Sequence, residues 1–503
     1  MTATPRARSV PGVQVISPER LRERLSELKS AGAHLAQTAE PVRTDPAEIG
    51  PESRPVESET RSAEPESCPA PEPRVVASGN LATPYRLLEA LDGALERYRL
   101  FMLAAHGPLP QREGVVHETP FVGPGMRDSG AWLDYLPMRL SLVPRLFATM
   151  RAPDAVLLHT STPRAGRVSL GIEVNVLVAA VEHVRSRGGL VVAQMNRHMP
   201  YTYGEGELDE ELIDIAIEVD EELPCPPLVG DHDEQAVAIA EQVAALVDDG
   251  ATLQLGIGQV PDATLHALRS RQKMRVWSEM ISDGVMELER RGALESEREI
   301  VCSFMFGSRE LYEWVDGNPR VRMMRTETTN DPSRIAAQPQ MTSINTALQI
   351  DLQDQAGASH INGRLYSGFG GQPDFVGGAL HSPGGHAVIA LRSWHDPSAT
   401  STIVPRLGDP ATSFQHSAVV TEHGCAHVFG RSERAQARLL IERAAHPDAR
   451  GWLREAAAQA EQGSRRSRDG KGDGGGGGSG EAVQSQTPRA GGKLDRVGAL
   501  VKG

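Results

Sequence analysis

Short aliphatic runs alternate with amphipathic helical patterns over residues 74–462 of the 503-residue chain. Residues 155–158 (AVLL) have the pattern of a buried strand and are followed by a polar loop. Apolar residues at helical spacing then cover residues 174–184, and a second strand pattern follows over residues 190–193. Strands that alternate with helices in this way are typical of α/β folds with parallel sheets, so we predict this fold class.

A further helix pattern begins where Asp231 or Asp233 can cap a helix N-terminus. Apolar residues on one face of this helix predict that it packs on a sheet. Gly250 is expected to end the helix in a left-handed conformation, before a strand over residues 251–255. The residues of the apolar face are Val237, Ala240, Val243, Ala244 and Val247.

Composition predicts where the domains begin and end. The proline-rich stretch at residues 222–228 (ELPCPPL) separates two α/β sets, so we expect one α/β domain over residues 74–226 and a second over residues 227–462. Residues 463–503 are rich in glycine and polar residues, and we expect them to form a disordered tail.

Residues 1–73 form a separate N-terminal segment in this prediction. Ser17 is expected to cap a short helix whose leucines follow helical spacing at Leu21, Leu25 and Leu28. Residues 37–73 are rich in Pro, Glu and Ser and contain few large apolar residues. Such a stretch buries too little surface to offset its loss of conformational entropy, so we expect it to be disordered.

Composition and charge exclude several classes of function. Hydrophobic residues make up 39% of the chain, but no apolar run reaches the roughly 18 residues of a membrane helix. No secretory signal precedes the first strand pattern, and we expect a cytoplasmic protein. A net charge of -14 opposes nonspecific nucleic-acid binding. Cys68, Cys225, Cys302 and Cys425 lie far apart, so reduced thiols are expected, with neither disulfides nor a bound metal.

A glycine-containing loop, Gly256 to Asp262 (GIGQVPD), follows a strand pattern and opens a helix pattern. Exposed N–H groups at such a helix start favour anions such as phosphate, and glycine lets a ligand approach the backbone. The loop matches neither the dinucleotide fingerprint nor the nucleotide P-loop. By itself it is equally compatible with a tight structural turn.

Two further stretches carry candidate chemistry. Glu279 follows a strand pattern at residues 274–277, where open α/β sheets place their ligands, although the spacing alone favours a structural carboxylate. Gly370 and Gly371 lie in YSGFGGQPDF, where paired glycines allow two N–H groups to point at one oxygen, as in an oxyanion hole. A plain glycine turn is the competing interpretation.

Taken together, these stretches and their flanking text resemble the acetyl-CoA hydrolase/transferase family, which includes 4-hydroxybutyrate and butyrate:acetate CoA-transferases. The resemblance covers about residues 75–453 and is most specific in the second half. The matching text includes ATLQLGIGQVPDATL, WSEMISDGV, SFMFGSRELYEWVDGNP, NDPSRIAAQPQMTSINTALQIDL, INGRLYSGFGGQPDFVGGA and SAVVTEHGCAHVFGRSERAQARLLIERAAHP.

The resemblance implies two CoA-transferase-type α/β domains with the active site between them. It places the family's nucleophilic glutamate at Glu279 and the glycines near the reacting carbonyl at Gly370 and Gly371. Asn345, in SINTAL, matches a position near the coenzyme. The implied coenzyme A loop consists of Gly256, Ile257, Gly258, Gln259 and Val260.

The chain departs from the family pattern at several positions. Trp277 stands where the family often has His, which is expected to reshape the acyl pocket, and Phe369 stands where Val is common. Near the strand at residues 401–405 the family usually has a lysine, whereas this chain offers Arg392 and Arg406. The resemblance therefore leaves the residues that contact the coenzyme's phosphates unassigned.

The residue types suit the implied chemistry. A carboxylate with an ordinary pKa of about 4.3 is ionised at neutral pH and can attack a thioester without a general base. The resemblance implies transfer of CoA between an acyl-CoA and a short-chain carboxylic acid such as acetate, with coenzyme A as a substrate and no other cofactor, by a homo-oligomer. The alternatives are acyl-CoA hydrolysis in the same site and a catalytically silent CoA-binding scaffold.

Overall fold

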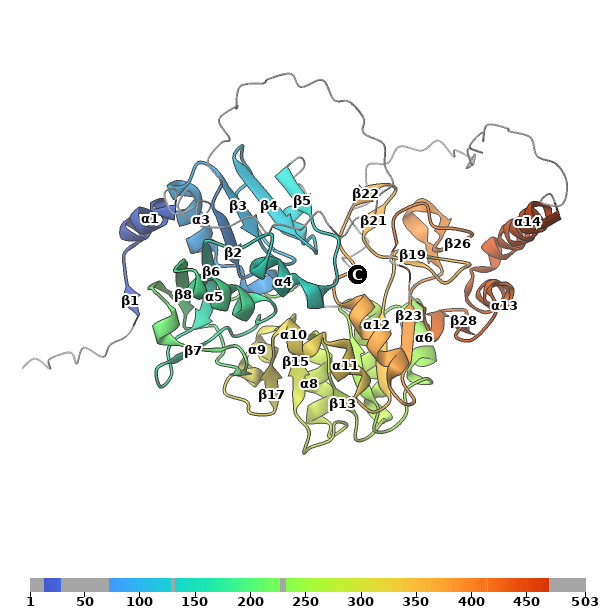
Figure 1. The fold of residues 1–503 in the computed structure, drawn as a ribbon. Helices are drawn as coiled ribbons and strands as arrows, with labels where there is room; N and C mark the ends of the chain where they lie inside the picture. The colour runs from blue at the N-terminus through green and yellow to red at the C-terminus, as the bar shows by residue number, and fades with distance from the viewer. Residues whose placement is uncertain are drawn as a thin grey trace, which may run out of the picture.

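The computed structural model describes residues 13–28, 72–127, 132–226, 232–411, 413 and 415–469 (Figure 1). Cys68, the acidic stretch up to residue 71 and the glycine-rich segment from residue 470 lie outside the described residues, so the disorder expected there stays a prediction. No helix in the described ranges is long and apolar enough to cross a membrane.

The first half of the chain forms a parallel sheet of eight strands in the order β1-β11-β8-β6-β2-β3-β4-β5. The strands are β1 (Gln14–Val15), β2 (Arg74–Ala77), β3 (Tyr98–Phe101), β4 (Val115–Thr119), β5 (Leu133–Tyr135), β6 (Ala155–Ser161), β8 (Leu190–Asn196) and β11 (Ile215–Val219). The helices of this half are α1 (Pro18–Ser26), α3 (Tyr85–Ala94), α4 (Val143–Ala148) and α5 (Leu177–Ser186). A small antiparallel pair, β7 (Arg167–Ser169) and β10 (Glu207–Asp209), accompanies the sheet.

Helices cover both faces of this first sheet. On β2, Val75 packs in one buried cluster with residues of α3, and its neighbour Val76 packs in another with residues of α5. Successive side chains of a strand point to opposite faces, so the two clusters lie on opposite sides of the sheet. Every residue of β6 is buried, as expected for a central parallel strand.

The second half builds a six-stranded sheet in the order β13-β12-β18-β23-β27-β28, parallel except for the last strand. Its strands are β12 (Thr252–Leu255), β13 (Arg275–Val276), β18 (Met341–Asn345), β23 (His386–Ala390), β27 (Ala418–Thr421) and β28 (Gly424–His427). Its helices are α6 (Glu234–Ala244), α7 (Gln259–Ala267), α8 (Asp283–Arg290), α9 (Arg309–Val315), α10 (Thr326–Thr329), α11 (Pro332–Ala336), α12 (Gln372–His381), α13 (Glu433–Leu439) and α14 (Arg450–Asp469).

Short strands surround this sheet. Two of the small groups are β14 (Met280–Ile281) with β16 (Phe304–Met305), and β15 (Ile300–Cys302) with β17 (Val321–Met323) and β9 (Tyr203–Gly204). The others are β19 (Gln349–Asp351) with β20 (Ala356–Gly357) and β26 (Ile403–Val404), β21 (His360–Ile361) with β22 (Arg364–Leu365), and β24 (Trp394–His395) with β25 (Thr400–Ser401). The prediction of a mixed α/β fold with parallel sheets is confirmed.

The two halves are joined by shared backbone pairing as well as by packing. Strand β9 belongs to the first half but pairs with β17 of the second. The Val174 N–H donates to the Ser303 carbonyl at 2.9 Å, and the Met305 N–H donates to the Ile172 carbonyl at 2.9 Å. One buried apolar cluster contains residues from both halves, so the halves share a core at the point where they meet.

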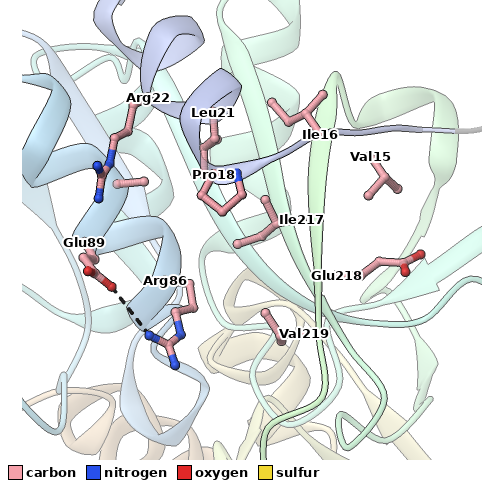
Figure 2. Close-up of a pocket in the computed structure, with 11 residues that line it drawn as sticks. Val15, Ile16, Pro18, Leu21, Arg22, Arg86, Glu89, Ile217, Glu218 and Val219 are labelled. Carbon is pink, nitrogen blue, oxygen red and sulfur yellow. Dashed lines mark ion pairs between the residues drawn. The ribbon is translucent and has the colours of Figure 1, made fainter.

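The short N-terminal helix expected from its leucines is present as α1. Ser17 caps it, accepting a hydrogen bond from the Arg20 N–H at 3.5 Å, and Leu21, Leu25 and Leu28 are buried. The preceding strand, β1, runs parallel to β11 as the outermost strand of the sheet. A groove of about 490 Å³ is lined by residues of this segment together with residues of α3 and β11 (Figure 2).

Two helix ends differ from the sequence prediction. Asp233 caps α6 as expected, but the helix stops at Ala244, where the Arg271 guanidinium donates to its carbonyl at 3.0 Å. Gly250, with φ of +79°, lies instead in the turn before β12. Helix α14 continues to Asp469, past Gly463 where the tail was expected to begin, because a single glycine does not stop a helix of otherwise favourable residues.

Replacing Leu25 with alanine tests how α1 is held. Leu25 is fully buried, so Leu25→Ala is expected to cost about 2–5 kcal/mol of local stability. The measurement is amide hydrogen exchange over residues 18–26, which should become faster. Glu23→Ala, on the exposed face of the same helix, is the control. Exchange in Leu25→Ala equal to that of the parent protein would contradict this packing.

Candidate active site

The order of strands in the second sheet reverses between β12 and β18, and open α/β sheets bind ligands beyond the carboxyl ends of strands at such a point. The loop Gly256–Val260 follows β12, and Asn345 ends β18, so the structure brings these predicted residues to one edge of the sheet. Gly258, with φ of +114°, is the N-cap of α7 and provides no side-chain cap. The first N–H groups of α7 therefore have no capping side chain.

The side chain of Asn345 belongs to a polar network at this edge. Its amide donates to Ser343 Oγ at 2.8 Å and to Gln254 Oε1 at 3.1 Å, and Gln254 Nε2 donates to Asn345 Oδ1 at 3.3 Å. Gln254 and Ser343 are both buried. These contacts hold Asn345 in one orientation, and sequence reasoning did not predict its two partners.

The loop also has a cationic neighbour. Arg392, which follows β23, donates to Gln259 Oε1 at 2.5 Å and forms an ion pair with Asp233 at 2.6 Å. Ile257, next to the glycines, is 39% exposed. Arg392, left open as a phosphate contact in the sequence prediction, therefore lies directly beside the predicted coenzyme loop.

Glu279 lies between β13 and β14, where the two halves of the chain meet. Its carbonyl accepts the N–H groups of Ser303 at 2.8 Å and Phe304 at 3.0 Å, which fixes its backbone. Its side chain is partly buried, and Oε2 accepts a hydrogen bond from Asn330 Nδ2 at 3.0 Å. The carboxylate is thus held at a junction and not on the outer surface.

Gly371 lies against this carboxylate. A Cβ atom at position 371 would lie 1.8 Å from Glu279 Oε2 and 2.3 Å from Asn330 Nδ2, so any larger residue would force one of these side chains to move. Gly371 is also the N-cap of α12, whose first turn therefore begins at the carboxylate. The structure thus brings two of the predicted site residues, Glu279 and Gly371, into contact.

Gly370 is positioned by the first half of the chain. It has φ of +51°, and its carbonyl accepts the Leu140 N–H at 3.1 Å. A Cβ atom at position 370 would lie 3.1 Å from the Phe121 ring, and one at Gly368 would lie 2.4 Å from the Pro120 carbonyl oxygen. The glycines of this loop therefore allow the first half to approach the site closely.

Burial raises the pKa of Glu279 to about 7. The Asn330 hydrogen bond opposes this shift, as does the nearby Gly371 N–H, whereas the negative charge of Asp374 adds to it. A carboxylate with a raised pKa is a more basic nucleophile than an ordinary glutamate, and it retains an ionised fraction at neutral pH.

Asn330 is a site residue that sequence reasoning missed. It is fully buried, and Thr329 donates its hydroxyl to Asn330 Oδ1 at 2.7 Å, which turns the amide nitrogen toward Glu279. Trp277 supports the same segment, because its indole N–H donates to the Thr329 carbonyl at 3.0 Å. Asn330 belongs to the NDPSRIAAQ stretch, and its position inside that text was the available signal.

The cysteines and the groove of Figure 2 are the other candidate sites. Cys225, Cys302 and Cys425 have free thiols, and the described residues contain no group of three or more metal-ligating side chains that could hold a metal ion. The groove in Figure 2 shares no lining residue with the Glu279 site. The candidate active site is therefore the place where Glu279, Asn330 and Gly371 meet.

The arrangement of two α/β halves, with Glu279 where they meet and a glycine loop at the sheet edge, agrees with the architecture that the sequence resemblance implies. The family model for the acetyl-CoA hydrolase/transferase C-terminal domain matches residues 307–457. The chain belongs to the acetyl-CoA hydrolase/transferase family and is an enzyme of that family.

Individual relatives agree with this assignment. The chain is 38% identical over 353 residues to the 4-hydroxybutyrate coenzyme A transferase of Clostridium kluyveri, covering 67% of this chain and 80% of the relative. It is 35% identical over 410 residues to the succinyl-CoA:acetate/propanoyl-CoA:succinate CoA transferase of Fasciola hepatica, covering 76% and 84%. The crystal structure of 4-hydroxybutyrate CoA-transferase from Porphyromonas gingivalis matches with a TM-score of 0.65 and 31% identity, covering 79% and 94%.

A methyl group at position 371 tests the contact with Glu279. Gly371→Ala is expected to lower acyl-CoA turnover about 100-fold, because the added Cβ displaces the carboxylate or Asn330. The matched control is Gly377→Ala in the same helix, where a Cβ atom would meet nothing within 4 Å. Steady-state rates and thermal unfolding of both variants provide the comparison. Equal rates for the two variants would rule out the close contact.

Proposed function

We propose that this enzyme transfers CoA between a short-chain acyl-CoA and a carboxylic acid such as acetate, with Glu279 as the nucleophile. The observation that carries the proposal is the Glu279 carboxylate held by Asn330 against Gly371, where the two halves meet. The relatives named as a 4-hydroxybutyrate CoA transferase and a succinyl-CoA:acetate/propanoyl-CoA:succinate CoA transferase support it.

The proposed reaction follows a ping-pong sequence. Glu279 attacks the thioester carbonyl, the carbon–sulfur bond breaks, and an acyl-glutamyl anhydride and CoA thiolate form. The thiolate then attacks the glutamyl carbonyl, which gives a glutamyl-CoA thioester and releases the first carboxylate. A second carboxylate reverses both steps and leaves with CoA. No net proton is gained or lost, so the sequence requires no general base.

The other site residues have distinct roles in this proposal. Gly370 and Gly371 lie next to the carbonyl that reacts, where backbone donors stabilise the tetrahedral oxyanion. Residues Gly256, Ile257, Gly258, Gln259 and Val260 bind coenzyme A through the open N–H groups at the start of α7, with Asn345 nearby. Coenzyme A acts here as a substrate, and the proposal requires no other cofactor.

Removing the nucleophile tests the proposal directly. Glu279→Gln and Glu279→Ala are expected to lower CoA transfer by about 10³-fold or more while the protein stays folded. Glu297→Gln, which changes an exposed glutamate in the same half, is the control and should keep the parent rate. After incubation with acyl-CoA, hydroxylamine should modify Glu279, as read by mass spectrometry. A label on another residue would refute the assignment.

The pH dependence of kcat/KM provides a second test. The attacking species is the ionised carboxylate, and the pKa of Glu279 is raised by burial to about 7. Activity is therefore expected to be low when Glu279 is protonated, to reach half of its maximum near the pKa of about 7, and to level off at higher pH. An acid limb centred near the ordinary value of 4.5 would contradict the buried environment described above.

Hydrolysis of acyl-CoA in the same site is the second candidate function, and the family's description includes both activities. Water would then resolve the anhydride or the glutamyl thioester. The release of free thiol from acetyl-CoA, measured with and without an added carboxylic acid, separates the two. Release that is independent of the added acid would favour the hydrolase.

A further inference from the structure

A second buried carboxylate lies close to Glu279. Asp374 is fully buried in the first turn of α12, three residues after the Gly371 that touches the nucleophile. Its oxygens are bound by the first half of the chain: the Ser141 N–H donates to Oδ2 at 3.1 Å, and the Ser141 hydroxyl donates to Oδ1 at 2.8 Å. Asp374 thus connects the nucleophile's surroundings to the opposite half.

Asn330 lies between the two carboxylates. Its amide nitrogen donates to Glu279 Oε2 at 3.0 Å, and its side chain opposes the rise in the pKa of Asp374. A primary amide has two N–H groups, so one Asn can serve two carboxylates at once. Thr329 holds Asn330 Oδ1 in place. If Asp374 is displaced, we therefore expect the geometry of the hydrogen bond from Asn330 to Glu279 to change.

Among the described residues, few charged groups act on Glu279 and Asp374. Asp374 on α12 is the charged group acting on Glu279, and Arg139, just before the segment that contributes Ser141, acts on Asp374. Burial raises the pKa of Asp374 to about 6, but Ser141, Arg139 and Asn330 oppose that shift. More groups stabilise the negative charge of Asp374 than that of Glu279. Asp374 therefore keeps its charge, and the repulsion between the two charges raises the pKa of Glu279.

We propose that Asp374 is a positioning residue which, held by Ser141 across the junction of the two halves, orients Asn330 and makes the Glu279 carboxylate more reactive. This inference rests on the proposed role of Glu279 as the nucleophile. Asp374 itself forms no bond to substrate.

The proposal has a direct consequence for the reaction. Repulsion between two buried anions raises the energy of the free enzyme, and it disappears when Glu279 becomes a neutral anhydride or thioester. The negative charge of Asp374 therefore favours formation of the covalent intermediates. Because Ser141 comes from the first half, this arrangement is complete only when the two halves are in contact.

Asp374→Asn removes the charge with little change in shape. We expect kcat to fall about 10-fold or more, KM for acetyl-CoA to stay within about 2-fold, and the acid limb of kcat/KM to move to lower pH by about one unit. Asp374→Glu keeps the charge, so its acid limb should stay near that of the parent while kcat falls. Asp396→Asn, at an exposed aspartate, is the control and should change none of these values.

The outcomes separate this inference from the proposed function. If Glu279→Ala is inactive but Asp374→Asn keeps the parent pH profile and kcat, the role of Asp374 is overturned and the nucleophile stands. If Glu279→Ala stays active, the proposed function itself is wrong. Should Asp374→Asn fail to fold, Ser141→Ala decides: a lower kcat at unchanged KM supports the role of the pair, and a parent kcat overturns it.

Discussion

The geometry of the candidate active site depends on Gly371 having no side chain. Because no Cβ is present there, the start of α12 can approach the loop that carries Glu279, and the carboxylate, the Asn330 amide and the helix N-terminus share one small volume. A helix N-terminus favours negative charge, whereas burial opposes it. Burial raises the pKa of the carboxylate and the charge of Asp374 adds to the shift, but the Asn330 hydrogen bond and the Gly371 N–H oppose it, so the pKa lies near 7.

The junction between the halves combines specific polar contacts with an apolar core that both halves share. Backbone hydrogen bonds join residues 172–174 to residues 303–305, and Leu140 donates to Gly370. The Ser141 to Asp374 contact is one of the side-chain links, and its Asp374 side chain is fully buried. Buried polar groups of this kind are costly when they lose a partner, so the arrangement favours one relative placement of the halves.

Much of this organisation could be predicted from the sequence because it follows from local patterns. Alternating strand and helix patterns predicted the α/β fold, and Asp233 was correctly assigned as a cap. The resemblance to a family singled out Glu279, for which spacing alone favoured a structural role, and Gly371, which spacing alone left open between an oxyanion hole and a plain turn. Local patterns did not reveal the Asn330 to Glu279 contact or the Ser141 to Asp374 pair, since these contacts join residues 51 and 233 positions apart. The end of α6 was also missed, and there the Ala244 carbonyl accepts a hydrogen bond from the distant Arg271 guanidinium.

The two-residue strand β1 has an effect larger than its size suggests. By pairing with β11 it satisfies backbone groups that would otherwise face outward along the rim of an eight-stranded sheet. An open rim is a template for pairing with foreign chains and for aggregation. Because β1 spans only two residues, the edge that it leaves exposed offers few backbone groups to a foreign strand, which disfavours aggregation.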